Sequence, residues 1–195
     1  MIFKELHLAG FGKFQNQTIR FNPGLNIVFG RNESGKSTIF QALLGIIFGF
    51  KSERERYSPW KRPEQFLASL ELETPTHRIQ IERDFREDFV KMLEEEISSS
   101  GNISFQGKVS PLGRSSERDV YLKKIHKLFG FSDPEIFKHS LFIEQRSLHQ
   151  LPSPQTSTEL KQLISHLSEF KYDDMIKRLE ERYFQLTKKN PRGVD

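Results

Sequence analysis

Short stretches of alternating apolar and polar residues dominate the amino-terminal half of the chain, a pattern typical of half-buried β-strands. Ile2 to Leu8 and Thr18 to Phe21 alternate in this way, whereas Leu25 to Phe29 is a nearly continuous apolar run. A continuous run indicates a strand that is covered on both faces. We therefore predict three strands before Gly30, the third of them buried.

The segment after this run has the spacing of a helix. From Lys36 to about Phe48 the apolar residues recur every three or four positions, which predicts one amphipathic helix. Further on, four stretches alternate again, and Thr74-Pro75-Thr76 separates the first two as a hairpin turn would. These stretches are Phe66 to Leu72, Arg78 to Phe85, Phe89 to Leu93 and Ile103 to Val109.

Helical signals return in the second half of the chain. Ser116-Glu117-Arg118-Asp119 resembles a capping box that opens a helix ending near Gly130, and Asp133-Pro134 opens another. Beyond a short apolar strand at Leu141 to Gln145, two apolar stripes of helical spacing extend to about Lys189. Each stripe covers about two heptads, fewer than a coiled coil requires, so amphipathic helices on a globular core remain an equal alternative.

Composition and charge narrow the picture only in part. At 195 residues the chain can form one ordinary domain with an appendage. The net charge of +4 fits a nucleic-acid partner, although many soluble proteins are equally basic. The absence of Cys excludes disulfides and thiolate metal sites. The start of the chain is charged, unlike a signal peptide, and the longest apolar run, Ile39 to Phe50, is too short to cross a bilayer. We therefore expect a cytoplasmic protein without a membrane partner.

One motif carries specific chemistry. Gly30 to Ser37 reads G-R-N-E-S-G-K-S and fits G-x-x-x-x-G-K-[ST], the phosphate-binding P-loop. It follows a strand pattern and opens a helix, a context that an incidental glycine turn would lack. Backbone N–H groups and a helix start attract phosphate. Lys36 should reach the β- and γ-phosphates of a nucleoside triphosphate, Ser37 should bind Mg²⁺, and Thr38 can donate to the α-phosphate.

Hydrolysis requires acidic residues as well, usually at the end of a buried strand. No run of four apolar residues after Gly35 ends in Asp-Asp or Asp-Glu. The nearest candidate is Leu141-Phe142-Ile143-Glu144, which ends in Glu-Gln. Either Glu144 acts in an unorthodox way, or the acidic pair lies on a segment outside this chain.

Four segments occur along the chain in the order Leu6 to Phe14 (LHLAGFGKF), Pro23 to Val28 (PGLNIV), the P-loop, and Phe142 to Gln145 (FIEQ). Together they resemble the amino-terminal halves of the SMC/SbcC-type ATPases, most of all the YhaN-like branch. The resemblance is least specific between Leu70 and Val109. It implies an α/β fold: the amino-terminal lobe of an ABC-type P-loop NTPase head at residues 1–150, with a sheet around the P-loop strand and an adjoining antiparallel sheet. Residues 151–195 would be a helical segment leading into a coiled coil.

The resemblance also assigns residues to the site. It implies that Gln145 is the Q-loop glutamine, which contacts Mg²⁺ and the attacking water. Gly12 and Lys13 would approach the nucleotide, and Asn32 would orient its γ-phosphate. The expected cofactors are ATP and Mg²⁺, with Lys36 and Gln145 as catalytic residues and Ser37 and Gln145 at the metal. The full nucleotide-binding set would be Lys13, Gly30, Asn32, Glu33, Ser34, Gly35, Lys36, Ser37 and Thr38.

The leading hypothesis is therefore a DNA-repair and DNA-processing ATPase in which two heads close over ATP and change how DNA is held. In this family the Walker B acids and the signature motif lie in the carboxyl-terminal half, so the chain would be an incomplete ATPase without that half. The family further implies a homodimer of heads and a metallophosphoesterase nuclease as partners. Because the chain stops far short of a long coiled coil, we expect either a truncated form or one fragment of a split protein.

Other interpretations stay open. A GTPase would show D-x-x-G and N-K-x-D, and neither occurs. A small-molecule kinase would need a lid arginine cluster, for which Arg54, Arg56 and Arg62 are candidates, and a clamp that uses ATP only for assembly is a third possibility. DNA could contact a loop that carries Lys51, Arg54, Arg56, Lys61 and Arg62 with Tyr57 and Trp60. A solvated loop beside the nucleotide is the simpler interpretation of these residues.

Overall fold

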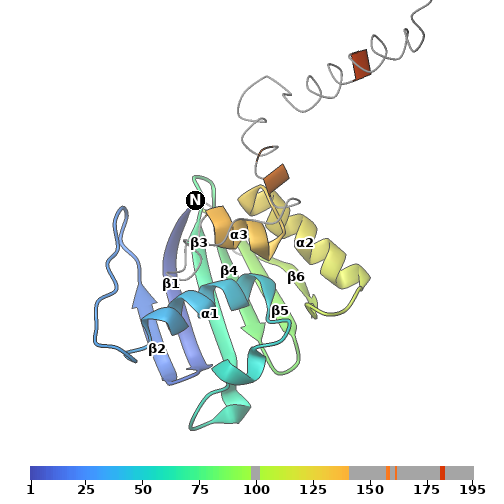
Figure 1. The fold of residues 1–195 in the computed structure, drawn as a ribbon. Coiled ribbons are helices and arrows are strands. Elements are labelled where there is room, and N and C mark those ends of the chain that lie inside the picture. The colour runs from blue at the N-terminus through green and yellow to red at the C-terminus, as the bar shows by residue number, and fades with distance from the viewer. Residues whose placement is uncertain (98–101, 141–156, 159–160, 162–180, 183–195) are drawn as a thin grey trace, which may run out of the picture. The chain divides into compact units, whose positions relative to one another are not determined.

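Six strands form one antiparallel sheet in a computed structural model of the chain (Figure 1). The structure describes residues 1–97, 102–140, 157–158, 161 and 181–182. The strands are β1 (Ile2–Phe11), β2 (Phe14–Arg20), β3 (Leu67–Glu73), β4 (His77–Asp84), β5 (Phe89–Glu96) and β6 (Asn102–Lys108). Their order across the sheet is β2-β1-β3-β4-β5-β6, so β1 and β3 are neighbours although they are not consecutive in the chain.

The alternation in the sequence separates the two faces of this sheet. Leu70 and Leu72 of β3 lie opposite Ile81 and Ile79 of β4, and all four side chains are buried. The intervening positions, such as Glu71 and its partner on β4, are polar and partly or fully exposed. The predicted hairpin and the two strands after it are therefore confirmed, because period-two alternation fits a sheet with one buried face.

The helix α1 (Lys36–Phe48) covers the buried face and contacts β1, β3 and β4. Its buried residues include Ile39, Leu43, Ile46 and Ile47. At the end of α1 the core is aromatic, with ring centroids 4.8–6.0 Å apart. This aromatic cluster consists of Phe11, Phe50, Tyr57, Phe66 and Phe85.

The helix α2 (Ser116–Phe129) packs against β6 and reaches the end of α1. The Tyr121 hydroxyl donates to the Ile47 carbonyl at 2.8 Å. The cap of α2 is Ser115, whose hydroxyl accepts the Arg118 N–H at 3.1 Å. The sequence predicted the helix correctly but placed its cap one residue late, at Ser116.

The prediction of a buried strand at Leu25 to Phe29 is wrong. The segment has no strand conformation, and Leu25, Ile27 and Phe29 are 86%, 79% and 96% exposed. A strand buried on both faces needs hydrogen-bonding neighbours and two covering layers. No strand in the described part of the chain pairs with this segment, so the expected sheet around the P-loop strand is not formed there.

The chain divides into two units, Met1–Phe129 and Gly130–Asp195. In the second unit, α3 (Pro134–Ser140) begins as predicted, because the Asp133 carboxylate accepts the Glu135 N–H at 2.7 Å. The predicted strand at 141–145 and the domain boundary near 150 lie outside the described residues, as does the coiled-coil segment at 151–195 apart from residues 157–158, 161 and 181–182. Within the described ranges, no helix combines the length and the apolar character needed to span a membrane.

Candidate nucleotide-binding site

The P-loop connects the exposed apolar segment to the first turn of α1. Gly35 precedes the helix with φ of 98°, in the left-handed region where side chains are strained. A β-carbon at Gly35 would also lie 2.5 Å from Cζ of Phe14, the first residue of β2. The backbone angle and the neighbouring ring therefore both favour glycine at this position.

The Lys36 ammonium folds back onto the loop. Its Nζ donates to the Gly30 carbonyl at 2.7 Å and to the Arg31 carbonyl at 2.8 Å. The side chain is partly buried, so these carbonyls replace much of the water that would otherwise solvate the charge. The charge is thus held against the backbone that the motif provides for phosphate.

The turn between β1 and β2 lies beside the loop. Phe11 and Phe14 pair across this two-residue turn, and the Lys13 Nζ donates to the Glu33 carbonyl at 2.9 Å. A β-carbon at Gly12 would lie 3.2 Å from Cγ2 of Thr38. The structure therefore brings Lys13 and Gly12 together with the P-loop, at a sequence separation that no local pattern reveals.

The other predicted site residues differ in exposure. Asn32, Glu33 and Ser37 are exposed, whereas Ser34 and Thr38 are partly buried. Mg²⁺ usually keeps several waters and takes one or two protein oxygens beside phosphates, so the exposed Ser37 hydroxyl fits such a role. Among the residues that the structure describes, no group of three His, Cys, Asp or Glu could hold a metal ion. Glu144 and Gln145 lie outside those residues.

The loop after α1 is tied to the same turn. It contains the short 3₁₀ helices η1 (Arg54–Tyr57) and η2 (Pro63–Gln65). The Gly12 N–H donates to the Tyr57 carbonyl at 2.7 Å, and the Trp60 N–H donates to the Gly12 carbonyl at 3.0 Å. This loop therefore lies beside the turn that meets the P-loop, in line with the sequence interpretation.

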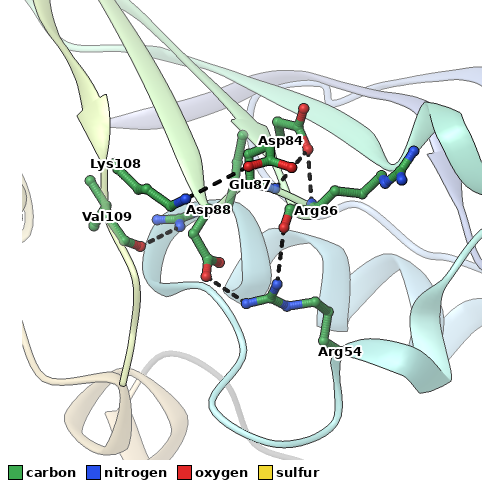
Figure 2. A network of polar contacts seen from close by, with 8 residues as sticks. Arg54, Asp84, Arg86, Glu87, Asp88, Lys108 and Val109 are labelled. Atoms are coloured by element: carbon green, nitrogen blue, oxygen red, sulfur yellow. Dashed lines mark hydrogen bonds and ion pairs between the residues drawn. The ribbon is translucent and has the colours of Figure 1, made fainter. Parts of the chain in front are cut away.

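The predicted cationic patch on this loop is smaller than the sequence indicated. Arg54 pairs with Asp88 and donates to the Arg86 carbonyl (Figure 2), and Arg56 lies 3.6 Å from the carboxylate of Glu53. Tyr57 is 8% exposed, so its ring cannot stack on a base from outside. The remaining exposed members of the patch are Lys51, Trp60, Lys61 and Arg62.

A buried arginine at the far end of α1 escaped the sequence analysis. Arg83 is fully buried, and it donates to the carbonyls of Ile46 at 2.9 Å, Val109 at 3.1 Å and Ile47 at 3.4 Å. Burial lowers the pKa of its guanidinium, while the negative end of the helix dipole favours a cation there. The sequence did contain an indication of this burial, because Arg83 follows Ile79 and Ile81 at the same two-residue spacing and therefore lies on the buried face of β4.

Comparison with known proteins places this geometry in a family. A family model described as an AAA domain matches residues 5–191. The chain is 25% identical over 187 residues to a DNA double-strand break repair Rad50 ATPase of Thermoplasma volcanium, covering 95% of this chain and 19% of that protein. It is 24% identical over 184 residues to a DNA replication and repair protein RecF of Limosilactobacillus reuteri, covering 92% and 47%.

A third relative belongs to the branch that the sequence analysis named. The protein YhaN of Bacillus subtilis is 29% identical over 136 residues, covering 67% of this chain and 13% of that protein. The chain thus spans less than half the length of each of these relatives. The match to the family model nevertheless extends over nearly all of the chain. The chain therefore belongs to the AAA domain family and, as its motifs predicted, to the SMC- and Rad50-like P-loop ATPases within it.

Proposed function

We propose that the chain is the amino-terminal half of an ATP-binding and ATP-hydrolysing head of a DNA-repair ATPase. The observation that carries this proposal is the P-loop at the start of α1, with the Lys36 Nζ 2.7 Å from the Gly30 carbonyl and Lys13 beside it. The names of the Rad50 and RecF relatives support a role in DNA repair.

The residues of the loop divide the work of binding. Lys36 exchanges its carbonyl partners for oxygens of the β- and γ-phosphates, where its charge offsets the charge that develops during phosphoryl transfer. The free N–H groups at the start of α1 bind phosphate, and Thr38 donates to the α-phosphate. Ser37 supplies an oxygen to Mg²⁺, which neutralises charge on the phosphates when bound. Asn32 and Gln145 orient the γ-phosphate and the attacking water.

A carboxyl-terminal half of the same ATPase completes this head in our proposal. The exposed side chains of Leu25, Ile27 and Phe29 support it, because an apolar run of this kind gains free energy when another layer covers it. That half would bring the catalytic acids that the described residues lack. ATP-dependent pairing of two heads, DNA binding and a nuclease partner belong to the same proposal.

One ion pair of the loop after α1 weighs against a small-molecule kinase. A kinase lid needs arginines that can reach the phosphates, but Arg54 is engaged by Asp88, which leaves only the exposed Arg56 and Arg62 of the three candidates. The family model likewise describes an AAA domain.

The test is Mg-ATP turnover by the chain alone and after mixing with the separately expressed carboxyl-terminal half. We expect almost no turnover by the chain alone, turnover after mixing, and a loss of at least about 100-fold with Lys36→Ala, because one preorganised cation at developing charge contributes at this level. Arg31→Ala, which keeps the loop backbone and changes an exposed side chain, is the matched control. Full turnover by the chain alone would contradict the split head and direct attention to Glu144.

A further inference from the structure

Trp60 is an exposed aromatic side chain next to the nucleotide site. It is the single tryptophan of the chain and is 75% exposed. Aromatic side chains of this size are highly buried on average in folded proteins. Its neighbour Pro59 is buried, whereas residues 61–65 are exposed like Trp60, so the indole lies where the loop turns from the core to its solvent-facing part.

The backbone around Trp60 is held from three sides. The Trp60 N–H donates to the Gly12 carbonyl at 3.0 Å, and the Gly12 N–H donates to the Tyr57 carbonyl. Pro59 lies so close to β1 that a β-carbon at Gly10 would be 3.0 Å from its Cγ. Arg54 ties the start of the loop to Asp88 and to the Arg86 carbonyl, in the turn between β4 and β5 (Figure 2). The backbone that carries the indole is therefore fixed in place beside the turn between β1 and β2.

The order of the phosphates along the P-loop gives the direction of the base. Lys36 is suited to the β- and γ-phosphates and Thr38 to the α-phosphate, so the nucleoside leaves the loop at Thr38. Gly12 touches this threonine, since a β-carbon there would be 3.2 Å from Cγ2. Trp60 is one backbone hydrogen bond beyond Gly12, with its N–H 3.0 Å from the Gly12 carbonyl, so its backbone lies directly beside this turn.

We propose that the indole of Trp60 stacks on the base of the nucleotide bound at the P-loop. The inference rests on the proposed function and adds the part of the site that holds the base. Stacking uses the face of a base, which every base has, so it favours the larger purine ring without reading the hydrogen-bonding edge. The platform should therefore accept ATP and GTP more readily than CTP and UTP.

The single tryptophan makes the proposal directly measurable. We would titrate the chain with Mg-ATP and with Mg-triphosphate, which lacks a base, and follow tryptophan fluorescence and binding heat in parallel. We expect ATP to change the fluorescence with the same dissociation constant that calorimetry gives. Triphosphate should compete for the site while leaving the fluorescence nearly unchanged.

Four outcomes would overturn the inference. If ATP binds by calorimetry and the fluorescence does not respond, or if triphosphate gives an equal response, the indole does not stack on the base and the P-loop proposal stands. If neither ligand binds, the proposed function fails together with the inference. If the response to ATP survives Lys36→Ala and a single-stranded oligonucleotide produces it equally, the indole contacts nucleic acid instead.

Two substitutions give a second measurement that does not depend on fluorescence. Trp60→Ala should weaken ATP binding by about five- to tenfold and leave triphosphate binding unchanged, whereas Trp60→Phe should keep most of the affinity. Leu112→Ala is the matched control, because Leu112 is 74% exposed and follows Pro111, which contacts the opposite end of α1 at Gly49. Equal effects of Trp60→Ala on ATP and triphosphate would contradict base stacking.

Discussion

Gly35 combines two constraints that act through different physical effects. Its φ of 98° disfavours any side chain, and the ring of Phe14 occupies the space that a β-carbon would need. Gly24 has a similar φ of 86°, but no atom lies within 4 Å of the position that a β-carbon would take there. The two glycines therefore allow the backbone effect and the steric effect to be measured separately.

We predict that Gly24→Ala lowers the free energy of unfolding by about 1 kcal/mol, the usual strain of a left-handed alanine. Gly35→Ala should lower it by about 2–3 kcal/mol and abolish ATP binding, because the clash with Phe14 adds to the strain. Urea denaturation and calorimetry measure the two quantities. Equal destabilisation by both substitutions would show that Phe14 yields without resistance.

Tyr121 is a buried phenol at the end of α1, and burial raises its pKa above the ordinary value of 10.0. A raised pKa means that the folded state holds the proton more tightly than the unfolded state. The stability contributed by this group is therefore complete below about pH 10 and is lost as the pH rises through the folded-state pKa.

We accordingly predict that the free energy of unfolding falls more steeply above about pH 10 in the native chain than in Tyr121→Phe. The substitution removes the titrating hydroxyl and its bond to the Ile47 carbonyl, so it adds a constant loss at lower pH. Denaturation curves between about pH 8 and pH 11, which bracket the ordinary pKa of a phenol, give the difference between the two proteins. Parallel pH profiles would exclude Tyr121 as a source of the alkaline sensitivity.

At the scale of elements, both ends of α1 are held by specific polar contacts in addition to core packing. Its first turn continues the P-loop, and its last carbonyls accept from Arg83 and Tyr121. These donors come from β4 and α2, so the helix end joins two elements that are distant in sequence. A buried guanidinium with several carbonyl acceptors is stable only while the acceptors stay in place.

Arg83→Met keeps much of the volume of the side chain and removes its donors. We expect a loss of about 3 kcal/mol in the free energy of unfolding, because the buried carbonyls of Ile46 and Val109 are left without this partner. Arg78→Met on the same strand is the control. Arg78 is half exposed and lies 3.2 Å from Glu71, and an exposed pair of this kind contributes less than about 1 kcal/mol. If both variants lowered the free energy of unfolding equally, the buried hydrogen bonds of Arg83 would stabilise the fold no more than an exposed ion pair does.

The sequence predicted well those elements whose structure is determined by residues close together in the chain. The β3–β4 hairpin and the helix at Lys36 to Phe48 follow from periodicity and turn residues within one segment. Arg83 was missed because a charged residue in an alternating strand is ordinarily placed on the solvent face. Leu25 to Phe29 was misplaced for the opposite reason, since an apolar run indicates what would be buried but not whether the covering layer is present.

In the candidate site, the P-loop was predicted from its motif, and the position of Lys13 beside it was predicted from the family resemblance. Neither the motif nor the resemblance predicted the contact between Gly12 and Trp60. That contact depends on a two-residue turn in β1–β2 meeting a loop more than forty positions later, and long-range pairings of this kind leave no periodic trace in one sequence. The sequence also overestimated the cationic patch, because Arg54 pairs with Asp88, a residue 34 positions away that only the fold brings next to it.

At the scale of the whole molecule, the exposed segment with Leu25, Ile27 and Phe29 is the surface where we expect the carboxyl-terminal half to bind. We predict that replacing these three residues by Ser reduces binding of a hydrophobic dye and prevents association with the carboxyl-terminal half. The free energy of unfolding of the chain itself should change by less than about 0.5 kcal/mol, since exposed side chains contribute little to it.

The control for this variant removes the same number of exposed apolar side chains elsewhere. Ile97, Ile103 and Leu112 are 65%, 54% and 74% exposed and lie near or beyond β6 in sequence. Their triple replacement by Ser should leave association with the carboxyl-terminal half unchanged, as measured by analytical ultracentrifugation of the mixed halves. Equal effects of the two triple variants would indicate a general loss of apolar surface instead of a specific interface.

The two hydrogen bonds of the Lys36 ammonium should make the loop selective among anions. The ammonium has three N–H donors, so a ligand can use the third one directly but gains the other two only by replacing the Gly30 and Arg31 carbonyls with its own oxygens. Chloride or a lone carboxylate offers too few acceptors in the right places, whereas a chain of phosphates offers several along the loop. We therefore expect chloride and single carboxylates to compete only weakly with a polyphosphate for Lys36.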